Sequence, residues 1–247
     1  MPKFGDMKRI AIFICCTIIS IAFSACAQNN MLQEGLALKY LVREPRTHAG
    51  KPPVAILMHG YGSNEADLFE LAQFFPDDFL VISVRAPYPQ GPTGFQWFEK
   101  DRSKQKYTPI KAQVEDSRDL LLKFIPQVVS WHHADAANIY VMGFSQGAIM
   151  SYEVGLTSPA TIKGIGILSG GLPTGLEKEI KPSPTLSRLR IFIAHGTADN
   201  ILSYQDGKDG YDQLVKLGLK PELHTYTGMA HTITSQVVAD LVKWLKS

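Results

Sequence analysis

A serine between two glycines, in the pentapeptide "GFSQG" at residues 143–147, has the residue types and spacing of a nucleophile on a sharp turn. Such a turn joins a strand to a helix and exposes the serine hydroxyl for attack on an acyl carbon. The preceding run, "NIYVM", predicts a strand, and the following run, "QGAIMSYEVG", predicts a helix. Because chance also produces this pentapeptide, its strand, turn and helix context is what identifies Ser145 as a candidate nucleophile.

A serine hydroxyl needs a base to take its proton and an acid to orient that base. Asp199 follows the apolar run "LRIFIAHG", and His231 follows "ELHTYTG", so each residue lies just beyond a predicted strand. Ligand and catalytic residues of open α/β sheets collect at these carboxyl ends of strands. The sequence therefore predicts a triad of Ser145, Asp199 and His231.

Other acids and histidines have simpler explanations. We interpret three aspartates as surface residues of a polar loop and helix start: Asp206, Asp209 and Asp212. His195 is interpreted as structural, and His132 and His133 as the end of a helix. His224 lies in a predicted strand and His48 in a loop. A histidine at a helix C-terminus is favoured by the helix dipole.

Acyl transfer also requires N–H donors for the developing oxyanion. The stretch "LMHGYGSN" follows a predicted strand, contains Gly62 where a substrate could approach, and places Asn64 as a helix cap. The backbone N–H groups of Tyr61 and Gln146 are the expected donors. Gln146 would donate from the N-terminus of its helix.

The elements that must position these residues alternate along the chain. Short apolar runs predict strands at 36–42, 53–60, 79–86, 138–144, 164–170, 189–196 and 222–228. Longer runs predict helices near 64–75, 112–131, 146–157, 204–217 and 235–246. This order predicts an α/β fold with a mostly parallel central sheet covered by helices on both faces. Residues 87–109 show no regular pattern, and a loop of this length often covers a site.

The N-terminus has the layout of an export signal: Lys3, Lys8 and Arg9 precede an apolar run over 10–23 and then small residues. "FSAC" resembles a lipobox that would make a lipidated Cys26 the first mature residue, whereas "ACA" before Gln28 fits ordinary signal peptidase. We expect a signal segment at 1–26, a single catalytic domain at 31–247, and a lipoprotein facing the periplasm or cell exterior. A soluble periplasmic or secreted protein is the alternative.

Cysteine usage and charge exclude several function classes. All three cysteines lie in residues 1–26, so the predicted domain has no disulfide, thiolate nucleophile or cysteine-based metal site. Residues 1–25 hold three of the 25 basic and one of the 23 acidic residues, which leaves 22 of each and no net charge. A nucleic-acid partner is therefore not expected.

The motifs "LMHGYGSN", "WF" at 97–98, "GFSQGA", "HGTADN" and "GMAHTI" occur in the order and spacing of a known family. Over residues 36–246 the chain resembles the phospholipase/carboxylesterase family of α/β-hydrolases, which includes acyl-protein thioesterases and small bacterial carboxylesterases. The resemblance implies an α/β-hydrolase fold without a large lid domain, the triad and oxyanion donors named above, and no metal or organic cofactor. It also suggests that Trp97 and Phe98 wall the acyl site, with aromatic core packing as the alternative.

The sequence departs from the family pattern in two motifs: Met229 and Ala230 precede the histidine, and Ser203 replaces a proline after the acid motif. The expected function is hydrolysis of short or medium acyl esters through an acyl-enzyme, and export favours an exogenous small-molecule ester. Lysophospholipase or thioesterase activity and feruloyl or acetyl esterase activity on polysaccharide are alternatives. A serine peptidase would need an additional domain, and a non-catalytic binding module would retain the fold without the chemistry.

Overall fold

The computed structural model describes residues 31–47, 50–103 and 108–247. The leader, its cysteines and His48 lie outside the described residues, so what the sequence predicts about export stays a prediction. Within the described ranges, no helix has the combination of length and apolar character that a membrane span requires.

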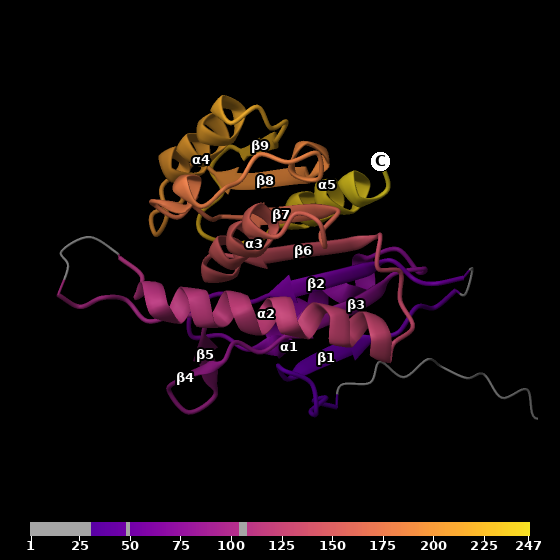
Figure 1. The fold of residues 1–247 in the computed structure, drawn as a ribbon. Helices are drawn as coiled ribbons and strands as arrows, with labels where there is room; N and C mark the ends of the chain where they lie inside the picture. The colour runs from indigo at the N-terminus through magenta and orange to yellow at the C-terminus, as the bar shows by residue number, and fades with distance from the viewer. Residues whose placement is uncertain (1–30, 48–49, 104–107) are drawn as a thin grey trace, which may run out of the picture.

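A seven-stranded sheet with the order β1-β3-β2-β6-β7-β8-β9 forms the centre of the fold (Figure 1). Its strands are β1 (Tyr40–Arg43), β2 (Val54–Met58), β3 (Leu80–Val84), β6 (Ile139–Phe144), β7 (Gly164–Leu168), β8 (Arg190–Gly196) and β9 (Glu222–Tyr226). Only the edge strand β1 pairs antiparallel within this sheet, and the other neighbours are parallel. Each observed strand falls within, or within one residue of, a predicted range.

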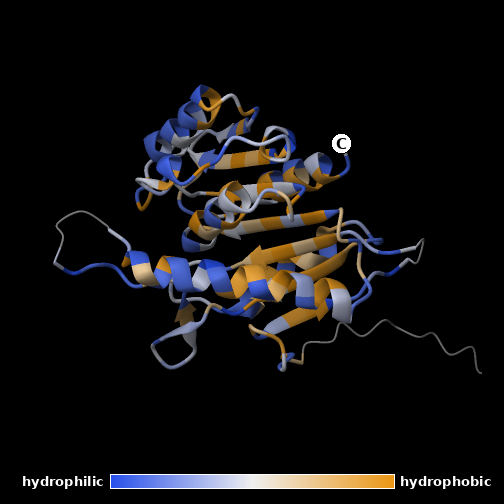
Figure 2. Cartoon of the chain, viewed as in Figure 1, coloured by the Kyte–Doolittle hydropathy of each residue, from blue (hydrophilic) through white to orange (hydrophobic). Residues whose placement is uncertain are grey.

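Helices cover both faces of the sheet, which confirms the predicted fold class. They are α1 (Glu65–Phe69), continued by the 3₁₀ turn η1 (Glu70–Phe74), α2 (Lys111–Trp131), α3 (Gln146–Thr157), α4 (Tyr204–Lys216) and α5 (Ser235–Leu245). One apolar cluster joins the sheet to α2, α3 and α4, and a second joins it to α1 and α5. Figure 2 shows mostly hydrophobic residues along the strands and both hydrophobic and hydrophilic residues on the covering helices. No large lid domain is present in the described part of the chain.

The central strands are apolar on both faces because helices cover both sides of them. Every residue of β2, β3 and β7 is buried. Parallel strands enclosed in this way have continuous rather than alternating hydrophobic sequences. The continuous apolar runs in the sequence therefore predicted these strands correctly.

Two helix starts are capped by short polar side chains. The Asn64 side chain accepts a hydrogen bond from the Ala66 N–H at 2.9 Å, which confirms the predicted cap. At α4, Ser203 and Asp206 form a reciprocal capping box. Such caps satisfy N–H groups that have no partner within their own helix. Asp206 is thereby assigned to the start of a helix, as the sequence suggested.

The prediction of no regular structure over 87–109 was wrong in part. A two-stranded hairpin joins β4 (Tyr88–Gln90) to β5 (Gly94–Gln96). Its turn contains Gly91, whose φ of 71° favours glycine. Three-residue strands are too short to give a periodic signal, and β4 contains a proline, which sequence patterns place outside strands. Residues 104–107 of the same stretch are outside the described residues.

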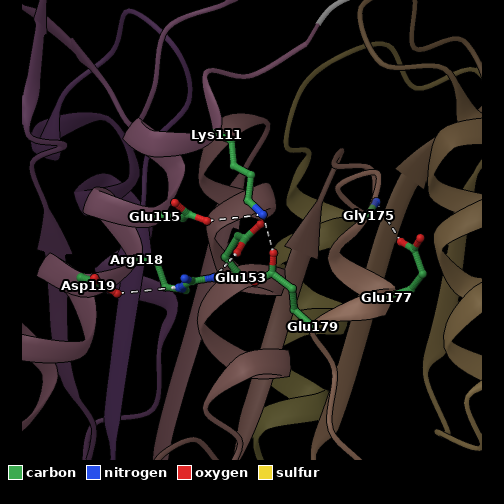
Figure 3. Close-up of polar contacts among 8 residues, drawn as sticks. All are labelled: Lys111, Glu115, Arg118, Asp119, Glu153, Gly175, Glu177 and Glu179. Carbon is green, nitrogen blue, oxygen red and sulfur yellow. Dashed lines mark hydrogen bonds and ion pairs between the residues drawn. The ribbon is translucent and has the colours of Figure 1, made fainter.

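An ion-pair cluster holds the segment after β7 against α2 and α3 (Figure 3). The Arg118 guanidinium on α2 lies 3.1 Å from the Glu153 carboxylate on α3 and 3.2 Å from that of Glu179. Lys111 at the start of α2 lies 2.9 Å from Glu179. Burial raises the pKa of Glu153, and Arg118 opposes that rise. Arg118 therefore compensates for a carboxylate that is largely removed from water.

Candidate active site

Ser145 occupies a strained turn between β6 and α3. Its φ of 55° and ψ of −113° lie outside the ordinary regions for a residue with a side chain. Backbone strain of this kind costs about 1–3 kcal/mol and persists only where the surroundings impose it. The Ser145 N–H donates to the Leu168 carbonyl of β7 at 3.0 Å, which ties the turn to the sheet. The strand, turn and helix predicted around Ser145 are all present.

The two flanking glycines are required because backbones meet at both positions. A Cβ on Gly143 would lie 2.2 Å from the carbonyl carbon of Gly147. A Cβ on Gly147 would lie 2.0 Å from the Met58 carbonyl oxygen at the end of β2. Real Cβ atoms do not approach backbone this closely. The glycines therefore allow β6, α3 and the end of β2 to pack directly against one another.

Asp199 and His231, the predicted acid and base, form a hydrogen-bonded pair. Asp199 Oδ2 lies 2.7 Å from His231 Nδ1, and Oδ1 accepts the N–H groups of Ile201 and Leu202, both at 3.0 Å. The Asp199 side chain has no exposed surface, whereas that of His231 is 14% exposed. Burial opposes ionisation of Asp199, but the hydrogen bonds outweigh it and lower its pKa. The carboxylate is therefore ready to orient and stabilise an imidazolium.

Two packed loops bring this pair together from the ends of β8 and β9. The Thr197 N–H donates to the Tyr226 carbonyl, and the Ala198 N–H donates to the Met229 carbonyl, each at 3.0 Å. A Cβ on Gly196 would lie 2.0 Å from that same Met229 oxygen. Met229, a departure from the family pattern, therefore uses its backbone to hold the loop that carries Asp199, here called the acid loop (residues 197–202).

His231 also packs against the residue that precedes Ser145. The Phe144 and His231 rings have centroids 4.7 Å apart and planes inclined by 40°. Phe144 ends β6, so this contact places the imidazole beside the Ser145 turn. The structure thus gathers the ends of β6, β8 and β9, with Ser145, Asp199 and His231, at one edge of the sheet.

The loop after β2 passes directly beside Ser145. A Cβ on Gly60 would lie 3.5 Å from the Ser145 Cβ and 3.2 Å from the Phe144 ring. Tyr61 follows Gly60, and its side chain is 56% exposed. Gln146 is the first residue of α3, where N–H groups point out of the helix end. Tyr61 and Gln146, the two predicted oxyanion donors, are therefore near Ser145 in the chain or in space.

His59 is a buried residue of this loop to which the sequence gave no role. Its Nε2 accepts the Ala86 N–H at 3.1 Å, so its Nδ1 carries the proton and donates to the Gly60 carbonyl at 2.7 Å. Burial lowers the pKa of His59, which keeps the ring neutral. His59 thereby ties the loop after β2 to the end of β3. We call residues 59–63 the oxyanion loop, because they include the predicted donor Tyr61. The sequence signal for His59 was a histidine directly after a buried strand.

Trp97 and Phe98 have 0% exposed surface and belong to the core cluster under α2 and α3. Their predicted contact with a substrate stays a prediction. His195 is also fully buried, with Nε2 2.8 Å from the Leu202 carbonyl and 3.5 Å from Asp199 Oδ2. It lies beneath the acid loop, which fits its interpretation as structural.

Comparisons of the sequence and of the fold find related proteins. The family model described as Phospholipase/Carboxylesterase matches residues 42–247. Acyl-protein thioesterase 1 of Mycosarcoma maydis is 29% identical over 235 residues, covering 85% of this chain and 96% of its own. The crystal structure of esterase PE8 has a TM-score of 0.72 at 28% identity and covers 83% of this chain and 96% of its own. The Bacillus cereus carboxylesterase, at 21% identity, shares the fold with a TM-score of 0.73, covering 88% of this chain and 95% of its own.

Proposed function

The chain belongs to the phospholipase/carboxylesterase family, serine hydrolases of carboxylic esters, and we propose that it hydrolyses its substrate through an acyl-enzyme on Ser145. The observation that carries this proposal is the strained Ser145 turn, placed at the sheet edge that also holds the 2.7 Å Asp199–His231 pair. Strain at a half-buried polar residue such as Ser145 is retained where the surroundings impose it, and it clusters at functional sites.

In the proposed reaction, Nε2 of His231 takes the proton of the Ser145 hydroxyl as its oxygen attacks the acyl carbon. Nδ1–H of the imidazole donates to Asp199, whose negative charge stabilises the imidazolium. The N–H groups of Tyr61 and Gln146 hold the oxyanion of the tetrahedral intermediate. His231 then gives the proton to the leaving alkoxide, and water repeats the sequence to release the acid.

We propose short or medium acyl esters as substrates. Two exposed apolar side chains near the site support this: Tyr61 in the oxyanion loop is 56% exposed, and Ile201, two residues after Asp199, is 67% exposed. We propose that these two side chains border the site and contact a small acyl or alcohol group. A thioester is the second candidate, because a relative of similar length is named an acyl-protein thioesterase.

The test is a substrate panel with the purified protein. It contains p-nitrophenyl esters from acetyl to palmitoyl, an alkyl thioester, a lysophospholipid and methyl ferulate, each assayed with wild type and Ser145→Ala. We expect the highest kcat/KM for acyl chains of about eight carbons or fewer, and no activity above background for Ser145→Ala. A fluorophosphonate probe should label wild type only. The absence of both hydrolysis and labelling would refute the proposed function and revive a non-catalytic binding module.

We also propose that residues 31–247 act as one catalytic domain after export directed by residues 1–26, with a lipid anchor on Cys26. The support is the basic, apolar and small-residue order of the leader and the "FSAC" motif. Mass spectrometry of the mature N-terminus after expression in a Gram-negative bacterium tests this. A diacylglyceryl group on Cys26 that is lost in Cys26→Ser is the expected result, and an unmodified N-terminus beyond residue 26 contradicts lipidation.

A further inference from the structure

Trp97 is a fully buried residue whose three polar groups bond to three different parts of the active-site scaffold. Its indole Nε1–H donates to the His59 carbonyl at 2.9 Å. Its backbone N–H donates to the side-chain oxygen of Gln146 at 3.0 Å. Its carbonyl accepts the Ser117 hydroxyl of α2. Trp97 is thus linked both to the loop that carries Tyr61 and to the residue that follows the nucleophile.

The strand before Trp97 binds the other end of the oxyanion loop. The Gly62 N–H donates to the Phe95 carbonyl at 2.9 Å, and the Phe95 N–H donates to the Ser63 carbonyl at 2.7 Å. A Cβ on Gly94 would lie 2.2 Å from the Gly62 carbonyl oxygen, so the two backbones touch. Tyr61 therefore lies between two anchor points, His59 and Gly62, that both attach to residues 95–97.

The Gln146 side chain completes the connection on the nucleophile side. Besides accepting the Trp97 N–H, its Nε2 donates to the Phe98 carbonyl at 2.8 Å. The glutamine residue is only 3% exposed. The oxygen and the nitrogen of this side-chain amide thus both hydrogen-bond to the backbone of residues 97–98. The two proposed oxyanion donors, on Tyr61 and Gln146, are attached to the same short segment.

The geometry points to Trp97 as a positioning residue that sets the distance between the two oxyanion donors, an inference that rests on the proposed function. Trp97 acts through His59 and Gln146 and not by touching substrate. Oxyanion stabilisation depends on donors that are already placed where charge develops, so small displacements reduce it. Packing alone does not explain the residue, because a phenylalanine would fill most of the same volume without the indole N–H.

The decisive variant is Trp97→Phe, which removes the Nε1–H donor and keeps an aromatic ring. We measure kcat and KM for a p-nitrophenyl ester, the fraction of active sites by fluorophosphonate titration, and Ki for a trifluoromethyl ketone analogue. The ketone forms a hemiketal with the nucleophile and places an oxyanion between the donors. Because removing one oxyanion donor costs about 10²- to 10³-fold in kcat, a displaced donor should cost about 10- to 100-fold. KM should change by less than about threefold, and Ki should rise by the same factor as kcat falls.

A merely structural role gives a different pattern. Partial unfolding lowers the titrated fraction of active sites and leaves Ki and kcat per active site unchanged. This pattern of results would overturn the inference. Trp244→Phe is the matched control, because this tryptophan on α5 is 3% exposed and its buried Nε1 has no hydrogen-bond partner among the described residues. The Trp244→Phe protein should have a kcat per active site within about twofold of the wild-type value.

A second variant covers the case in which Trp97→Phe does not fold. Gln146→Met keeps an unbranched side chain of similar length in α3 but removes both bonds to residues 97–98. It should also raise Ki and lower kcat together at nearly constant KM. Wild-type kinetics from a folded Trp97→Phe or Gln146→Met protein would refute the positioning role while leaving the proposed function intact. A wild-type protein with no ester hydrolysis dependent on Ser145 would instead refute the proposed function.

Discussion

Replacing Asp199 with asparagine tests whether this carboxylate orients the base. Two backbone N–H groups, of Ile201 and Leu202, point at Oδ1 from 3.0 Å. An asparagine NH₂ group at that position would leave both N–H groups without an acceptor, which would cost about 1–3 kcal/mol of folding free energy for each buried group. The asparagine must therefore keep its oxygen there and turn its NH₂ group toward His231.

In this orientation, the NH₂ group replaces the oxygen that lies 2.7 Å from His231 Nδ1. Nδ1 must then accept a hydrogen bond, so the ring proton moves to Nε2. That nitrogen can no longer take the proton of Ser145. The same change in a serine protease triad lowers kcat about 10⁴-fold, which corresponds to about 5 kcal/mol of transition-state stabilisation. We expect a loss of about 10³- to 10⁴-fold here.

The assay is kcat for a p-nitrophenyl ester, with circular dichroism and thermal unfolding as checks of the fold. Asp206→Asn is the matched control, because Asp206 accepts hydrogen bonds from Ser203 at the start of α4. It should cost some stability, about 0.5–1 kcal/mol, and leave kcat within about twofold. A folded Asp199→Asn protein that keeps more than a tenth of wild-type kcat would show that this reasoning is wrong.

The lowered pKa of Asp199 adds a stability test. A carboxyl group with a folded-state pKa below its unfolded value of about 3.9 stabilises the fold above that value. The contribution is lost as pH falls through the lower folded pKa. The difference in unfolding free energy between wild type and Asp199→Asn should therefore be largest near pH 6 and shrink below about pH 4. A difference that stays constant down to pH 2.5 would contradict the lowered pKa.

Three further substitutions test the scaffold. Gly147→Ala places a methyl group against a backbone carbonyl of β2, so it should lower the unfolding free energy by at least about 2 kcal/mol and abolish activity. Gly171→Ala is the control: a Cβ there meets only an ordinary 3.4 Å contact, so neither the unfolding free energy nor the activity should change. Tyr61→Ala should keep kcat within about threefold, because only the backbone N–H is assigned to the oxyanion; a loss of 100-fold would assign a catalytic role to the phenol. Arg118→Met should cost about 3 kcal/mol at pH 7, since it leaves the Glu153 carboxylate buried without its cation. Chemical denaturation should show a loss that shrinks as the pH is lowered toward the raised pKa of Glu153, because the protonated carboxyl needs no cation. The loss should also shrink in Arg118→Met combined with Glu153→Gln.

The sequence predicted those parts of the fold whose signals are local. Runs such as "PVAILMHG" and "NIYVMGF" are long, apolar and bounded by turn residues, so their strand character survives without knowledge of the neighbours. The three triad candidates were predicted for a related reason. A parallel sheet brings the carboxyl ends of its strands to one edge, so residues 145, 199 and 231 lie along that edge although they are distant in sequence.

The hairpin at 88–96 could not be predicted in the same way. Its strand β5 is stabilised by pairing with Ser63, about thirty residues earlier, through an isolated bridge to Phe95. Such non-local pairing leaves no periodic trace in a three-residue strand. Charged and polar residues after Phe98 also made the whole stretch resemble a surface loop. The missing information was the contact with residues 62–63.

Contacts between segments distant in sequence also explain why the bonds of Trp97 and the Gln146 side chain were not predicted. The two proposed oxyanion donors are backbone groups, so the proposed chemistry places no demand on the side chains of Tyr61 and Gln146. Sequence reasoning can locate such donors by loop position but cannot identify what holds them. In the structure, an indole N–H and a side-chain amide, both buried, connect the two donors. Where a site uses backbone donors, the informative side chains are therefore buried polar groups adjacent to it, and a tryptophan in a loop is as strong a candidate for positioning as for binding.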